Sequence, residues 1–355
     1  MKKKLIINCQ LSIVNYIVVI LLACFSACKD DSKAITFPEL PPPVYDMTGF
    51  AKGADLSWLT QMENEGCLFY DSIGRPTDCM TLLRNLGMNA VRLRVWVNPA
   101  DGWCDKNDVL IKAWRANNLG MRVMIDFHYS DSWADPGKQT KPAAWATLSF
   151  SDLKNAVTAH TEDVLTALKE HGVTPEWVQI GNETSNGMLW EDGRASTNMK
   201  NYADLTGAGY DAVKAIFPDA KVVVHLPDGN KNSTYRWIFD GLKNNGCKWD
   251  VIGMSLYPDT TNWQTMNTQC LSNITDMISR YGSDVMICET GMQWNRPETC
   301  KAFLTDLIAK TKTVPDNKCL GVFYWEPEGY VNWSGYAMSA FDNTGRPTAA
   351  LDAFK

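Results

Sequence analysis

Two glutamates in this sequence each close a run of apolar residues, and together they have the chemistry needed to cleave a glycosidic bond. Glu183 follows Gly181 and Asn182, and Glu289 follows Cys288. In such a hydrolysis one carboxylic acid donates a proton to the leaving oxygen, while the other carboxylate attacks the anomeric carbon or activates water. For either glutamate alone, a structural carboxylate in a salt bridge is an equally good interpretation. Asn182 beside the first glutamate, and the presence of the second, favour catalysis.

The two carboxyl groups would need different protonation states. We predict that Glu183 is the acid/base, with its pKa raised by burial and by the negative charge of Glu289. Glu289 would stay ionised as the nucleophile, with Arg94 supplying a compensating positive charge and Tyr257 donating a hydrogen bond to the same carboxylate. Asn182 would hold the sugar 2-hydroxyl, a contact that strengthens in the transition state.

Other polar and aromatic residues end further apolar runs, where substrate-binding side chains are expected. Trp325 would form a floor under the sugar, because the C–H faces of a pyranose lie flat on an indole ring. Trp96 is a second candidate platform, and His128 and His225 are candidate hydrogen-bonding residues whose alternative is a satisfied barrel histidine. The predicted substrate-binding residues are Asp55, Arg94, Trp96, His128, Asn182, His225, Tyr257 and Trp325.

Metal-dependent and serine-dependent hydrolysis both lack a supporting motif. The 4 histidines show no ligand spacing such as His-x-x-x-His, and no Gly-x-Ser-x-Gly elbow is present. The cysteines match no metal pattern either. Cys288 lies inside an apolar run, so we expect it to be a buried free thiol.

Eight apolar, strand-like runs alternate with helical patterns from about residue 47 to the end of the chain. The runs are 51–55, 90–96, 122–128, 177–183, 221–225, 251–257, 285–289 and 321–326, and the clearest helical patterns are 78–86, 151–171, 202–217 and 299–311. Continuous apolar strands are typical of a parallel sheet buried on both faces. Eight such units predict a single α/β domain, a closed (β/α)₈ barrel (TIM barrel) over residues 47–355, with functional residues at the C-terminal strand ends.

An open doubly wound sheet is the alternative fold for this alternation. Its dinucleotide-binding form lacks support, because no Gly-x-Gly-x-x-Gly follows the first run. The net charge of −6, with no basic block beyond the first residues, argues against a nucleic-acid partner. We therefore expect a neutral or weakly charged ligand. We also expect a monomer, although no feature of the sequence determines the oligomeric state.

The N-terminus resembles a bacterial lipoprotein signal. Lys2, Lys3 and Lys4 precede an apolar stretch, and small residues then precede two candidate acylated cysteines, Cys24 and Cys28. We prefer Cys28, because the Lys-Asp-Asp that follows it resembles the surface-export signal of Bacteroidetes lipoproteins. We predict a signal peptide over 1–27 and a proline-rich tether over 28–46. Its lipid would anchor the protein in the outer membrane, with the domain exposed at the cell surface; an uncleaved membrane anchor is the alternative.

Several stretches resemble glycoside hydrolase family 53, the arabinogalactan endo-β-1,4-galactanases. They are 53–57, 91–96, 179–183, 289–291 and the long run Asp-Phe-His-Tyr-Ser-Asp-Ser-Trp-Ala-Asp-Pro-Gly-Lys-Gln at 126–139. An Asn-Glu pair is shared by many barrel hydrolases, whereas the 126–139 run has an unusual composition that favours this family over mannanases and cellulases. The resemblance covers about residues 47–355.

The resemblance implies a retaining hydrolysis of β-1,4-galactan, the side chain of pectin, with the two carboxyl groups about 5–5.5 Å apart. It implies no cofactor. Some bacterial members hold a structural calcium ion near the last strands, but no Asp-x-Asp-x-His-x-Asn cluster occurs here. The alternatives are another β-1,4-glycanase on the same barrel and a non-catalytic surface glycan-binding lipoprotein. The second alternative predicts loss of one carboxylate, and both are present.

Overall fold

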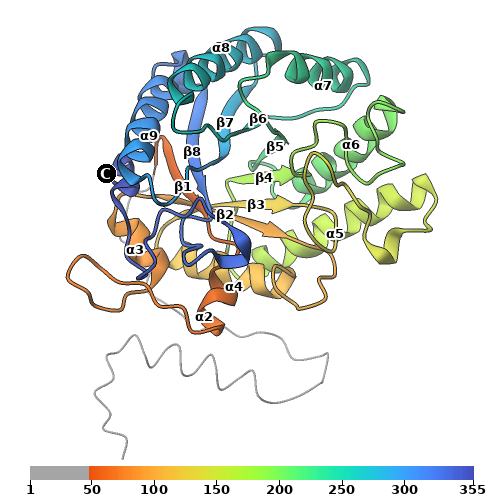
Figure 1. The fold of residues 1–355 in the computed structure, drawn as a ribbon. Coiled ribbons are helices and arrows are strands. Elements are labelled where there is room, and N and C mark those ends of the chain that lie inside the picture. Colours follow the sequence, from red (N-terminus) through yellow and green to blue (C-terminus); the bar gives the residue numbers. More distant parts are fainter. Residues whose placement is uncertain (1–47) are drawn as a thin grey trace, which may run out of the picture. The chain divides into compact units, whose positions relative to one another are not determined.

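The computed structural model describes residues 48–355 and shows a closed barrel of parallel strands (Figure 1). Each strand pairs with the next in sequence order, and the last pairs with the first. The strands are β1 (Ala51–Asp55), β2 (Ala90–Val95), β3 (Arg122–Phe127), β4 (Trp177–Ile180), β5 (Lys221–Leu226), β6 (Val251–Leu256), β7 (Asp284–Thr290) and β8 (Cys319–Trp325). The predicted signal peptide, Cys28 and the tether lie outside the described residues.

The predicted (β/α)₈ barrel is therefore confirmed, and all eight predicted runs are strands. The largest difference is at β4, which ends at Ile180 instead of Glu183. Gly181 has a φ of 77° and Glu183 a φ of 49°, both in the left-handed region. A strand cannot continue through that conformation, so Glu183 stands on a turn above the strand.

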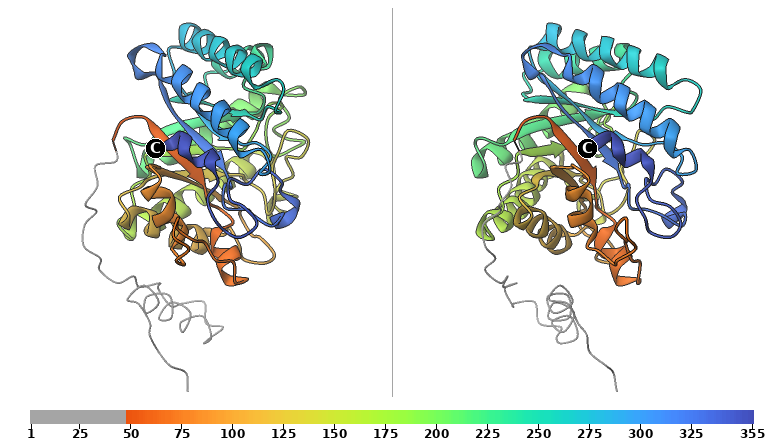
Figure 2. Two further views of the ribbon diagram at one scale, coloured as in Figure 1. Left: turned by 60° about the vertical axis from the view of Figure 1, so that its left-hand side comes forward. Right: turned by 90° about the vertical axis from the view of Figure 1, so that its left-hand side faces the viewer.

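Helices surround the barrel on its outer side, as the two further views show (Figure 2). The α-helices are α2 (Leu59–Asn64), α3 (Cys79–Asn85), α4 (Lys106–Asn118), α5 (Phe150–Glu170), α6 (Met199–Ile216), α7 (Asn232–Asn244), α8 (Trp263–Tyr281) and α9 (Pro297–Lys312). Short 3₁₀ turns lie at η1 (Ala143–Trp145), η2 (Pro315–Asn317), η3 (Trp333–Gly335) and η4 (Ala349–Phe354). Among the helices of residues 48–355, none combines the length and apolarity needed to cross a bilayer.

Side chains at the helix starts explain where several helices begin. The Asp78 carboxylate accepts a hydrogen bond from the backbone N–H of Thr81 at the start of α3. Ser149 does the same for Asp152 at the start of α5. Such caps satisfy N–H groups that have no partner inside the helix. The caps place α3 and α5 within two residues of the predicted starts.

Large apolar side chains close the N-terminal end of the barrel. Trp177, Phe323 and Met286 pack there with no exposed surface, together with the free thiol of Cys288. Gly53 makes room for this packing, because a Cβ atom on it would lie 2.2 Å from the Phe323 ring. The packed floor leaves the C-terminal ends of the strands as the open face for chemistry.

Candidate active site

Glu183 stands at the C-terminal end of β4, partly exposed and held from one side by a hydroxyl group. The Ser255 hydroxyl on β6 donates a hydrogen bond to Glu183 Oε1 at 2.7 Å, and His225 Nε2 lies 2.9 Å from the same Ser255 oxygen. Burial raises the pKa of Glu183 to about 7. The Ser255 hydrogen bond and the more distant charge of Arg92 oppose the rise, and the negative charges of Asp135 and Asp228 add to it. No cation contacts this carboxyl directly among the described residues, so its neutral form is favoured.

Glu289, near the end of β7, has the opposite environment. Arg92 Nη2 lies 2.8 Å from Glu289 Oε1, and the Tyr257 hydroxyl donates to Oε2 at 3.0 Å. Burial raises the pKa of Glu289, the Arg92 guanidinium opposes that rise, and the charge of Glu183 adds to it. Two interacting carboxyls titrate as a pair, so near neutral pH they hold one proton between them. The ion pair with Arg92 keeps the negative charge on Glu289, which leaves the proton on Glu183.

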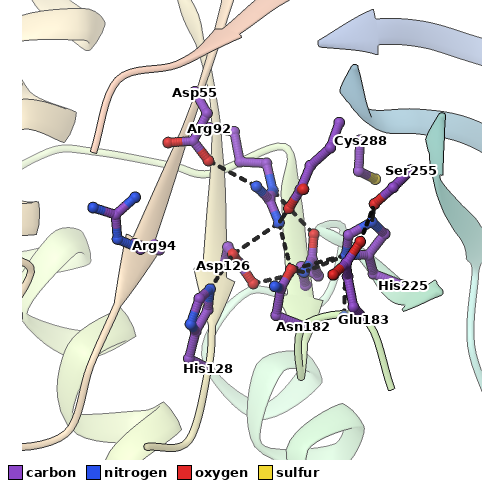
Figure 3. Close-up of polar contacts among 12 residues, drawn as sticks. Asp55, Arg92, Arg94, Asp126, His128, Asn182, Glu183, His225, Ser255 and Cys288 are labelled. Carbon is purple, nitrogen blue, oxygen red and sulfur yellow. Dashed lines mark hydrogen bonds and ion pairs between the residues drawn. The ribbon is translucent and has the colours of Figure 1, made fainter. Parts of the chain in front are cut away.

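Arg92 is the centre of the buried polar network (Figure 3). Its guanidinium lies 2.7 Å from Asp55, 2.8 Å from Asp126 and 2.8 Å from Glu289. It also donates to Asn182 Oδ1 at 2.9 Å. A planar guanidinium with five N–H donors can serve several carboxylates at once. Three carboxylates facing one cation leave this network negative, which suits a site that stabilises positive charge developing on a sugar ring.

The prediction that Arg94 compensates the charge of Glu289 is wrong. Arg94 forms its ion pair with Glu326, directly after β8, and Arg92 occupies the predicted position. The two arginines are two residues apart on one strand and therefore face the same side of the sheet. Sequence alternation could not decide between them. Figure 3 shows Arg94 set apart from the network of Arg92.

Aromatic rings form a second part of the site, around Arg94. Trp325 packs edge-on against Tyr336 and Trp58, with ring centroids 4.8 and 5.1 Å away, and Trp133 packs against Trp96 at 5.3 Å. Trp133 and Trp325 remain partly exposed. Indole faces of this kind are suited to the apolar face of a pyranose.

His128 and Trp96 hold one another in place. The Trp96 indole N–H donates to His128 Nδ1 at 3.1 Å, and His128 Nε2 lies 3.0 Å from Asp126. Because Nδ1 accepts, the ring proton lies on Nε2 and is donated to Asp126. Both ring nitrogens of His128 are therefore engaged with protein groups.

The predicted site residues all come together at this end of the barrel, in two layers. Asp55, Arg94 and His225 are fully buried and bonded to protein partners, so the structure places them as supports beneath the surface. Trp325 and Tyr257 are partly exposed. Asn182 Oδ1 faces Arg92, while its Nδ2 donates to the carbonyl of Ala134.

Several residues of the site are not among those predicted from the sequence. They are Trp58, Arg92, Asp126, Trp133, Gln179 and Ser255. Gln179 bridges the network, accepting from Arg92 and donating to Asp126. A charged or amide side chain inside an apolar strand was the available signal for Arg92, Asp126 and Gln179. Ser255 and Trp133 gave no comparable signal.

A calcium or other metal site finds no support in the side chains. Within residues 48–355 no group of three or more histidine, cysteine, aspartate or glutamate side chains is arranged to hold a metal ion.

A parallel barrel with two glutamates at the ends of β4 and β7, one of them paired with a cation, has the construction of a glycoside hydrolase. Comparison with known protein families leads to the same class of enzyme. The sequence model of glycosyl hydrolase family 53 matches residues 51–354. This chain belongs to that family and is a glycoside hydrolase.

Curated relatives and a solved structure have similar sequences along most of their length. The arabinogalactan endo-β-1,4-galactanase A of Emericella nidulans is 32% identical over 86% of this chain and 93% of its own. The endo-β-1,4-galactanase of Bacillus subtilis is 32% identical over 78% of this chain and 70% of its own. The family 53 catalytic domain of Ignisphaera aggregans superimposes with a TM-score of 0.80 at 32% identity, covering 89% of this chain and 98% of that domain.

Proposed function

We propose that this protein hydrolyses internal β-1,4-galactosidic bonds of galactan and type I arabinogalactan, with retention of configuration at the anomeric carbon. The observation that carries the mechanism is the asymmetry of the two glutamates. Glu289 has Arg92 and Tyr257 against its carboxylate, whereas within residues 48–355 the one side-chain contact of the Glu183 carboxyl is the Ser255 hydroxyl. The substrate assignment is supported by the galactanase names of the relatives in the same family.

In the first step, the Glu289 carboxylate forms a bond to the anomeric carbon while the bond from that carbon to the leaving oxygen breaks. The proton on Glu183 moves to the leaving oxygen. In the second step, Glu183, now a carboxylate, takes a proton from water, and the water oxygen displaces Glu289 from the anomeric carbon. Both glutamates then regain their starting protonation states.

The test is an incubation of residues 45–355 with β-1,4-galactan, mannan and cellulose, with product length and anomeric configuration followed over time. We expect short β-galacto-oligosaccharides from galactan alone. Glu183→Gln should lower kcat about 10²–10⁴-fold, and Glu289→Gln should lower it at least as far. Glu298→Gln on the exposed surface of α9 is the matched control and should leave activity unchanged. Cleavage of mannan or cellulose in place of galactan would overturn the substrate assignment, and binding without cleavage would overturn catalysis.

We also propose that Cys28 is acylated and that the chain is a surface-exposed outer-membrane lipoprotein. The support is the sequence pattern of residues 1–31, a basic start, an apolar stretch and small residues before a cysteine. Mass spectrometry of the N-terminal peptide from cell envelopes should find the lipid on Cys28. Cys28→Ser should release the protein from the envelope, and loss of anchoring in Cys24→Ser alone would contradict the choice of cysteine.

A further inference from the structure

A second pair of buried glutamates lies directly after β8, and the two members have very different partners. Glu326 accepts hydrogen bonds from the Arg94 guanidinium and, at 3.1 Å, from the backbone N–H of Trp58. Glu328 is as fully buried, yet within residues 48–355 no other residue's N–H or O–H donates to either of its side-chain oxygens. Its polar neighbour is the Glu326 carboxyl group, two residues before it in the chain and equally buried.

Full burial without a donor requires a proton on one of these two carboxyl groups. Ionised carboxylates only accept hydrogen bonds, and an ionised carboxylate that is buried without a partner is strongly unfavourable. Arg94 stabilises the negative charge on Glu326, so the proton belongs on Glu328. The pair is then one carboxylic acid and one carboxylate, and with Arg94 it is electrically neutral.

The surroundings favour the same protonation state. The titratable and charged groups that face the pair are Asp55 on β1, Cys79 on α3, Arg94 on β2, Cys104 before α4 and Tyr336 after η3. Arg94 is the one cation in that set, and it already forms an ion pair with Glu326. Burial and the charge of Glu326 raise the pKa of Glu328 well above its usual range.

The neutral pair has a consequence for the aromatic part of the site. The Arg94 guanidinium lies 4.2 Å from the ring centroid of Trp133 and 5.2 Å from that of Trp96, a geometry of cation–π attraction. A second negative charge on Glu328 would draw Arg94 toward both carboxylates and away from the indoles.

We propose that Glu328 is a positioning residue for the sugar platform: its protonated carboxyl group donates to Glu326 and so keeps Arg94 against Trp133. Glu328 acts through Arg94 and does not touch substrate itself. The inference rests on the proposed function in one respect, namely that the sugar bound by Trp133 is part of galactan.

The proton is tested by infrared spectroscopy in Glu183→Gln/Glu289→Gln protein, where the catalytic pair no longer titrates. At pH 8 we expect a protonated-carboxyl band that disappears when Glu328→Gln is added and remains when the control Glu298→Gln is added. A missing band at pH 8, or a band that survives Glu328→Gln, would overturn the assignment.

The positioning role is tested by comparing Glu328→Gln with Glu328→Ala. The amide of glutamine still donates to Glu326, so Glu328→Gln should keep the near-ultraviolet circular dichroism of the indole cluster and the KM for galactan. Glu328→Ala should change that spectrum and raise KM about fivefold with kcat nearly unchanged, a size expected for loss of one cation–π contact. Equal effects of both variants, or a fall in kcat alone, would contradict the proposal.

These readouts separate the two proposals. If the wild type does not cleave galactan, the proposed function fails, while the infrared band and the circular dichroism still decide the state of Glu328 and its effect on the indoles. If galactan is cleaved but the band is missing, the positioning proposal alone fails.

Discussion

The two glutamates of the active site have the same side chain, and it is their different surroundings that give them different roles. Both are carboxyl groups at strand ends, yet of the two it is Glu289 that Arg92 and Tyr257 contact directly. Ser255 contacts Glu183 and not Glu289, and it is the one direct side-chain partner of the Glu183 carboxyl among the described residues. The protonation state of Glu183 should therefore respond to Ser255 in a measurable way.

Ser255→Ala should move the alkaline limb of the pH profile to higher pH. Glu183 must be protonated to act as the acid, so kcat/KM falls as pH rises through its pKa, about 7 in the wild type. The Ser255 hydrogen bond lowers that pKa, and its loss should raise the pKa by up to about one unit. Initial rates on galactan from pH 4 to 10 measure this, with Ser151→Ala on the exposed face of α5 as control. A shift toward lower pH would contradict the assignment of Glu183 as the acid.

The two arginines of β2 should differ sharply when each is changed to lysine. Arg92→Lys leaves three buried carboxylates sharing an ammonium group that cannot reach them all, and should cost about 3–5 kcal/mol of folding stability and most of kcat. Arg94→Lys should mainly raise KM, because it weakens contacts with Trp133 and Trp96. Urea unfolding and steady-state kinetics compare the two variants. The reverse order of effects on kcat would restore the original prediction for Arg94.

At the scale of the elements, the apolar strand runs could be predicted because a parallel barrel buries both faces of each strand. That signal predicts all eight strands and places both glutamates at the ends of strands. The features that could not be predicted depend on contacts between residues that are far apart in the sequence. The choice between Arg92 and Arg94 depends on which carboxylates other strands bring near, and the position of Ser255 depends on the neighbouring strand β5 and its His225. The end of β4 depends on a left-handed turn at Glu183.

The tight packing at the N-terminal end of the barrel leads us to expect opposite effects on stability for two glycine-to-alanine variants. Gly53→Ala in β1 would place a Cβ atom 2.2 Å from the Phe323 ring and should destabilise the fold by about 1–3 kcal/mol. Gly207→Ala in α6 meets nothing within 4 Å and should stabilise the fold by about 0.5–1 kcal/mol, because alanine is the better helix former. Chemical denaturation measures both. A stable Gly53→Ala protein would contradict the tight packing of the floor.

For the whole molecule, ionisation of the active-site residue Glu183 should lower the stability of the folded state as pH rises. The pKa of Glu183 is raised to about 7 in the folded state, above its value in the unfolded chain. The folded state therefore binds the proton more tightly, and the stabilisation is present below about pH 4.5 and is lost as pH rises through about 7. Removing the ionisable group should reverse this loss.

Glu183→Gln should thus raise the melting temperature at pH 8 and leave it nearly unchanged at pH 4. The gain at pH 8 should be roughly 1–3 kcal/mol, from about 1.4 kcal/mol for each unit of pKa shift. Thermal unfolding of both proteins at the two pH values gives the comparison, with Glu298→Gln expected to show no such pH dependence. A destabilised Glu183→Gln at pH 8 would mean that the carboxylate is favourably paired.

The most direct test of the central claim is azide rescue of Glu183→Gly and Glu289→Gly with an activated β-galactoside, with the product's configuration read by NMR. If Glu289 is the nucleophile and Glu183 the acid/base, azide fills the place of Glu289 in Glu289→Gly and gives the α-galactosyl azide. In Glu183→Gly, azide attacks the galactosyl-enzyme and gives the β-galactosyl azide. The opposite pairing of variant and product would exchange the two roles, and rescue of neither variant would contradict catalysis by this pair.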